Sequence, residues 1–124
     1  MSDAIRVVRS NSNPGRDLEF NDWYTNVHIV EVVRDLAGFE SAQRFERSAD
    51  QVEDGTEYRY LAIYRIKPGM LETAQKAVLA QRAERAQALA AGRVPRIVVD
   101  TGLFGGPWKT WFFESITDQY TAPE

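Results

Sequence analysis

The sequence predicts an α+β fold in which four strands and two helices follow the order strand, helix, strand, strand, helix, strand. Short runs rich in β-branched and aromatic residues, each bounded by turn-forming residues, lie at 4–9, 39–47, 57–67 and 109–117. Two longer segments with few helix breakers separate them, at 14–36 and 71–91. This order is the split βαβ pattern of ferredoxin-like folds and implies one four-stranded antiparallel sheet.

The first helix is expected to begin after a turn. Asn13 is a plausible N-cap, Pro14 suits the first helical position, and acidic Asp17 and Glu19 favour a helix N-terminus. We expect this helix to continue to about Leu36, before a glycine interrupts it.

The segment 57–67 (EYRYLAIYRIK) is the strongest strand signal in the chain, and a polar loop at 50–55 precedes it. Pro and Gly end this strand, and the alanine-rich helix that follows is expected to stop at a C-terminal cap on Gly92. The later glycines at 102, 105 and 106 have neither the strand-to-helix context nor the lysine of a phosphate-binding loop, so they predict a flexible loop.

Two helices can cover only one face of such a sheet. The strand within 57–67 nevertheless carries apolar residues on both faces, because Leu61 and Ile63 alternate with its inward-facing tyrosines. We therefore expect a homodimer formed through the sheet faces, which would give a dimeric α+β barrel. The alternative is that Leu61 and Ile63 are tolerated surface residues.

Composition narrows the functional class. The 124 residues suggest a single domain spanning 1–124, with 44% hydrophobic and 27% charged residues. No apolar run approaches the ~20 residues that cross a bilayer, and no signal segment is evident, so we expect a cytoplasmic protein with no membrane partner. A net charge of -3 without basic clusters argues against nucleic acid. The absence of cysteine and the single histidine predict no metal site.

The single histidine, His28, lies in the first predicted helix. Tyr24 precedes it by four residues and Glu31 follows it by three, so the three side chains can form one stripe along the helix. We expect four side chains of this helix to face the sheet, those of Trp23, Tyr24, Val27 and Val30. His28 could then act as general acid or base, with Glu31 orienting the imidazole and the Tyr24 hydroxyl as a second donor. The alternative is a structural network in which His28 ties the helix to the sheet and Glu31 meets an arginine, Arg44 or Arg34.

Substrate-binding candidates come from the sheet. Ala62 lies between Tyr60 and Tyr64 on one strand face, and its small side chain predicts a local void that a ligand could fill. Trp111 is expected in the core or the dimer interface, or as the wall of a pocket for an aromatic ligand.

Several segments of the chain resemble the bacterial dimeric α+β barrel families related to EthD. They are the run 19–28 (EFNDWYTNVH), Glu31-Val32, Gly38-Phe39, the segment 41–45 (SAQRF) and a closing 111–114 (WFFE). The resemblance spans most of the chain and implies the same dimeric barrel. His28, Tyr24, Trp23 and Glu31 match the motif residue by residue.

The superfamily includes polyketide cyclases, cofactor-free monooxygenases, isomerases and haem-degrading enzymes. With this resemblance the leading hypothesis is an enzyme that needs no metal or organic cofactor and transfers protons on a small aromatic or carbonyl-containing substrate, as a lyase, isomerase or cyclase. His28 would move the proton, Glu31 would orient it, and Tyr24 or Arg44 would stabilise an oxyanion. Two alternatives stay open: a cofactor-free monooxygenase acting on an aromatic or polyketide-like substrate, and a non-catalytic ligand-binding or structural dimer.

Overall fold

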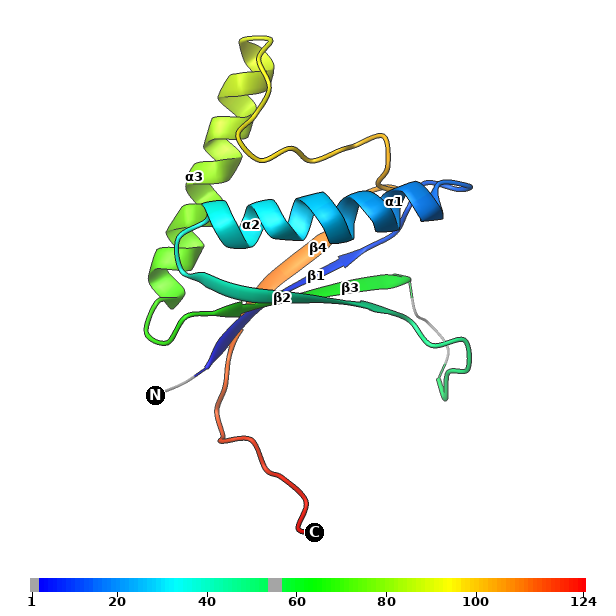
Figure 1. Ribbon diagram of the computed structural model, residues 1–124, viewed down its shortest axis with the longest axis vertical. Coiled ribbons are helices and arrows are strands. Elements are labelled where there is room, and N and C mark those ends of the chain that lie inside the picture. Colours follow the sequence, from blue (N-terminus) through cyan, green and yellow to red (C-terminus); the bar gives the residue numbers. More distant parts are fainter. Residues whose placement is uncertain (1–2, 54–56) are drawn as a thin grey trace.

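The computed structural model describes residues 3–53 and 57–124 and contains one four-stranded antiparallel sheet with helices on one side (Figure 1). The strands have the order β2-β3-β1-β4, so the first strand in sequence lies in the centre beside the third. The predicted α+β class and element order are confirmed. The strand bounds are β1 Ala4–Ser10, β2 Phe39–Glu46, β3 Tyr60–Ile66 and β4 Lys109–Glu114. The predicted polar loop at 50–55 lies partly outside the described residues.

The first helix crosses one face of the sheet and consists of three consecutive segments, α1 Asp17–Trp23, η1 Tyr24–His28 and α2 Ile29–Asp35 (Figure 1). Its predicted start was wrong: Arg16, not Asn13, occupies the N-cap position. Pro14 and Gly15 instead form a turn, which the Arg16 N–H closes by donating to the Asn13 carbonyl at 3.0 Å. Asn13 and Pro14, which were predicted to be the N-cap and the first helical residue, therefore belong to the turn before the helix.

The middle segment, η1, is a π-helical turn and changes which side chains face the sheet. A π turn holds more residues than an α turn, so positions four apart stay aligned through it instead of drifting around the helix. Buried residues accordingly recur at every fourth position, namely Phe20, Tyr24, His28, Val32 and Leu36. Val27 and Val30, predicted to face the sheet, are 40% and 47% exposed.

The second helix, α3 Leu71–Ala90, stands at one end of the sheet and rises away from it (Figure 1). Ala74 packs where the chain passes from α2 to β2, close to Gly38. The predicted cap at Gly92 is confirmed: Gly92 has a positive φ, and the Arg93 N–H donates to the Ala88 carbonyl at 2.9 Å. The first part of α3 thus contributes to the core, whereas its far end extends beyond the sheet.

The segment 91–108 returns from the end of α3 and packs against the first helix. The glycine-containing part that was predicted to be a flexible loop instead packs on the core through Leu103 and Phe104, both buried. The Asn13 side chain donates to the Gly102 carbonyl at 2.6 Å, and the Gly105 N–H donates to the Asn11 carbonyl at 2.8 Å. This segment therefore packs into the core beside the first helix, where the Phe104 ring contacts Phe20 and Tyr24.

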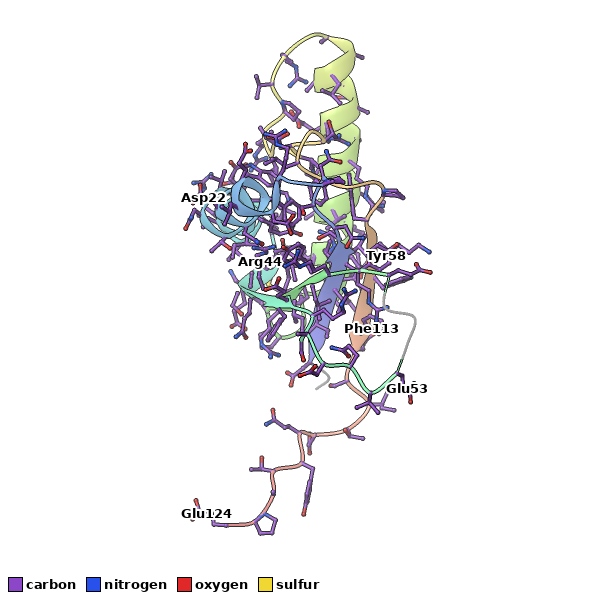
Figure 2. The ribbon with its side chains drawn as sticks, turned by 90° about the vertical axis from the view of Figure 1, so that its right-hand side faces the viewer. Asp22, Arg44, Glu53, Tyr58, Phe113 and Glu124 are labelled. Atoms are coloured by element: carbon purple, nitrogen blue, oxygen red, sulfur yellow. The ribbon has the colours of Figure 1, made fainter. Side chains whose placement is uncertain are left out.

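The two sheet faces differ in what covers them. Figure 2 places Arg44 between the first helix and the sheet and Phe113 on the side away from the helix. On that uncovered side Trp111 and Phe113 are 45% and 50% exposed, and Leu61 and Ile63 of β3, on the other side of β1, are partly buried. In the part of the chain that the structure describes, no helix combines the length and apolar character needed to cross a membrane.

Candidate functional site

His28 is held in one orientation by two aromatic rings. It is the last residue of η1, and its side chain is 9% exposed. Trp23 stacks on the imidazole with ring centroids 4.8 Å apart, and Tyr24 meets it edge-on at 5.0 Å. π turns within α-helices frequently occur at functional sites.

The two imidazole nitrogens have different environments. One nitrogen hydrogen-bonds the backbone of Val98, while Nδ1 is buried without a hydrogen-bond partner. The bond to Val98 therefore belongs to Nε2, which leaves Nδ1 as the free lone pair of the neutral ring. Burial is the main cause that lowers the pKa of His28 from 6.5 to about 4, and the charges of Arg6 and Arg44 act in the same direction. At neutral pH the imidazole is uncharged.

His28 lines a small cavity of about 70 Å³ between the sheet, the first helix, α3 and the returning segment. A buried cavity of about 150 Å³ binds benzene, so this one is too small for an aromatic ring as it stands. Its lining comprises Arg6 and Val8 of β1, Tyr24, His28, Val32 and Leu36 of the first helix and its end, Tyr64 of β3, Gln81, Arg82 and Arg85 of α3, and Ile97, Val99, Phe104 and Trp108 of the returning segment.

Tyr24 and Tyr64 join the helix to the sheet at this cavity. Their side chains hydrogen-bond each other, and burial raises the pKa of both hydroxyls. The Arg44 guanidinium lies 4.5 Å from the Tyr24 ring centre and donates to Asn21 Oδ1 at 2.9 Å and Thr25 Oγ1 at 3.0 Å. Arg44 therefore supports Tyr24 from outside the cavity lining.

Glu31 does not orient His28, so the predicted relay is wrong. The Val98 backbone occupies one imidazole nitrogen and Nδ1 has no partner, which leaves no hydrogen bond to Glu31. The alternative, a pairing of Glu31 with Arg34 or Arg44, is not found among the described residues: Arg34 pairs with Asp35 at 2.9 Å, and Arg44 donates to Asn21 and Thr25. Spacing along an α-helix predicted a hydrogen bond from His28 to Glu31, and the Val98 backbone of the returning segment takes its place.

The remaining predicted residues lie around the cavity or away from it. Trp23 contacts His28 directly. Tyr60 is on the covered sheet face but donates to Asp17 Oδ2 at 2.7 Å, and Ala62 is buried in the core; neither lines the cavity. Trp111 lies on the uncovered face, so the structure separates it from His28.

Sequence reasoning missed several cavity residues. Arg6 occupies the covered face of β1, on the same side as Ala4 and Val8, and a charged residue at a core-facing position of an apolar strand was a usable signal. Arg82 and Arg85 are three residues apart on one side of α3. No local sequence pattern predicts that α3 and β1 come together at this cavity. Across residues 3–53 and 57–124 no group of three His, Asp or Glu side chains is placed to hold a metal ion.

Comparison with known proteins agrees on the fold. No protein-family model and no curated protein matches the chain. Among solved structures, a protein of unknown function from Nitrosomonas europaea covers 99% of this chain and 98% of its own at 15% identity and a TM-score of 0.56. An EthD family protein from Bacillus halodurans covers 94% and 100% at 12% identity and 0.54. HapK from Hahella chejuensis covers 99% and 100% at 15% identity and 0.54.

These likenesses show that the chain shares its α+β fold with these solved structures, one of which is an EthD family protein. The predicted resemblance is thereby confirmed at the level of the fold. Identities this low carry no reaction from one protein to another, because one fold hosts many functions.

Proposed function

We propose that this chain is an enzyme that moves a proton on a small carbonyl-containing substrate, with His28 as the general base. The observation that supports this most directly is the buried, unpartnered Nδ1 of an imidazole whose other nitrogen bonds the Val98 backbone. A substrate C–H or O–H group in the cavity would meet this lone pair. The proposal requires neither a metal nor an organic cofactor.

The hydroxyls of Tyr24 and Tyr64 supply the complementary part of the proposed site. Both line the same cavity as His28, and both stay protonated at neutral pH because burial raises their pKa. A hydroxyl group that stays protonated can donate to the oxygen on which negative charge develops when a proton leaves the neighbouring carbon. Proton abstraction of this kind begins lyase, isomerase and cyclase reactions, and it also yields the carbanion that a cofactor-free oxygenase would expose to O₂.

A second candidate is a ligand-binding dimer without turnover. The observation that favours it is the pKa of His28, about 4, which makes the imidazole a weak base at neutral pH. On this proposal Nδ1 accepts a hydrogen bond from the ligand and takes no proton.

Hydrogen–deuterium exchange separates the two candidates. A panel of small ketones and 2-oxo acids is incubated in D₂O with the wild type, His28→Gln and the control Glu31→Gln, and loss of the α-proton signals is followed by NMR. The enzyme proposal expects acceleration by the wild type and by Glu31→Gln, and none by His28→Gln. Equal acceleration by His28→Gln would sink it, and saturable binding without exchange supports the second candidate. Oxygen uptake with the same compounds detects the oxygenase route.

We further propose that a second copy of the chain covers the exposed sheet face. Val7, Ile63 and Trp111 lie side by side in the strand register, so apolar side chains extend across three neighbouring strands of this face. A contiguous apolar patch of this kind is typical of an interface. Ile63→Asp should convert the dimer to a monomer in sedimentation equilibrium. The control Leu79→Asp, at an exposed position of α3, should leave the assembly unchanged. A wild-type monomer, or a dimer that Ile63→Asp leaves intact, would contradict the proposal.

A further inference from the structure

The cavity beside His28 concentrates positive charge in a protein that is acidic overall. Arg6 of β1 and Arg82 and Arg85 of α3 line it together, although the chain carries a net charge of -3. No aspartate or glutamate from the described ranges lines the same cavity. The charge therefore comes from elements that are far apart in the sequence and meet only in the fold.

Arg6 has unused hydrogen-bonding capacity. Its Nε donates to Thr110 Oγ1 at 2.9 Å, and its guanidinium lies 5.9 Å from the Phe112 ring centre. A guanidinium group has five N–H donors, and a charge withdrawn from water is unfavourable unless it is paired. Burial lowers the pKa of Arg6, while the neighbouring hydroxyls of Tyr64 and Tyr24 act in the opposite direction.

Other arginines of this chain are paired with acidic side chains. Arg16, Arg34, Arg59 and Arg93 each form an ion pair with a carboxylate, at 2.6–3.0 Å. Within residues 3–53 and 57–124 none of the three cavity arginines has such a pair. The charge at the cavity is therefore left without a counter-ion from the described chain.

The size of the cavity indicates what could balance this charge. A cavity of about 70 Å³ is about half the volume of one that binds benzene, so as it stands it suits a group the size of a carboxylate better than a ring. Beside the arginines, His28 also lines the cavity, and its buried Nδ1 is an unpartnered acceptor in the neutral ring. The lining thus offers cationic donors for an anion and, next to them, an acceptor for a proton-bearing group.

We propose that this cavity binds the carboxylate group of a small organic acid, held by Arg6, Arg82 and Arg85 next to His28. The inference rests on the proposed function and narrows its substrate class to carbonyl compounds that carry a carboxylate. Arginine suits this role because its planar guanidinium group carries paired N–H donors that match the two oxygens of a carboxylate. His28 would take a proton from the part of the substrate that lies next to its bound carboxylate group.

Binding of matched probes tests the inference without turnover. Propionate and its neutral counterpart propionamide are titrated separately into the protein, and the resonance of the single imidazole is followed by NMR. We expect propionate to shift this resonance saturably and propionamide to have no effect. Arg82→Gln and Arg85→Gln should each weaken propionate binding about tenfold. Lys76→Gln, at an exposed position of α3 outside the cavity lining, should bind as the wild type does.

Three outcomes would overturn the inference. One is equal binding of propionamide, and the second is an equal loss in Lys76→Gln. The third is binding of inorganic phosphate with the same arginine dependence while propionate does not bind. Arg6→Met is a further variant whose folding is checked first by circular dichroism, because Arg6 is partly buried. Propionate binding with no exchange activity would contradict only the proposed catalysis, whereas exchange on neutral ketones without propionate binding would contradict only the carboxylate site.

Discussion

The lowered pKa of His28 makes the stability of the protein depend on pH in a defined direction. Burial lowers this pKa from 6.5 to about 4 in the folded chain. Between these values the unfolded chain binds a proton at His28 that the folded chain does not, so the free energy of unfolding falls as the pH falls. Above the unfolded value the ring is neutral in both states, and the contribution is fully present.

The magnitude follows from the size of the shift. One pKa unit corresponds to about 1.4 kcal/mol, so the interval from 6.5 to about 4 corresponds to ~3 kcal/mol. Substitution by glutamine removes the titrating group and retains a polar side chain. The stability advantage of the wild type over His28→Gln should therefore shrink by ~3 kcal/mol between about pH 7.5 and about pH 4.

The assay is urea unfolding of both proteins at one fixed protein concentration, because assembly adds to apparent stability. Carboxylates titrate in both proteins and cancel in the difference. A parallel NMR titration follows the single imidazole and should give a midpoint near 4 in the folded protein. A difference in stability that stays constant with pH, together with a midpoint near 6.5, would refute the reasoning that burial disfavours the charged ring.

Three further predictions concern the folded framework. Gly38→Ala should destabilise the protein more than Gly69→Ala does, by ~1–3 kcal/mol, as measured by thermal unfolding. Both glycines have a positive φ, but only at Gly38 would the new methyl group crowd α3, at 3.1 Å from the Ala74 side chain. Equal losses of stability would contradict this. Phe20→Ala should cost ~3–5 kcal/mol in urea unfolding, whereas exposed Leu18→Ala should stay within about 0.5; a small loss at Phe20 would mean that the core repacks. Tyr24→Phe should cost ~1 kcal/mol by removing its hydrogen bond to the β3 tyrosine, and an unchanged stability would contradict that bond's contribution.

Most of the fold could be predicted because its signals are local. The alternation of β3, the alanine-rich composition of α3 and the cap at Gly92 each depend on neighbours within a few residues. The uncovered apolar face was also foreseeable, since Leu61 and Ile63 alternate with the buried residues of the same strand.

The candidate site was only partly predictable because it depends on long-range packing. His28, Tyr24, Trp23 and Tyr64 come together as expected, since they lie on the helix face and the strand face that meet in the core. The π turn has no local sequence signature, and it changed which residues face inward. The cavity also needs Arg6 from β1 and groups from α3 and the returning segment, and no spacing rule relates those elements.

The π turn has a consequence for how this chain tolerates insertions and deletions. Within η1, Thr25 and Asn26 are exposed, so losing one of them would remove no core side chain. It would take away the residue that widens the turn, so the segment could close into a regular α-helix in which His28 follows Phe20 by seven positions, close to two full turns. His28 and the buried residues of α2 would then still face the core. At this point of the helix, residue number is therefore less constrained than the identity of the buried residues.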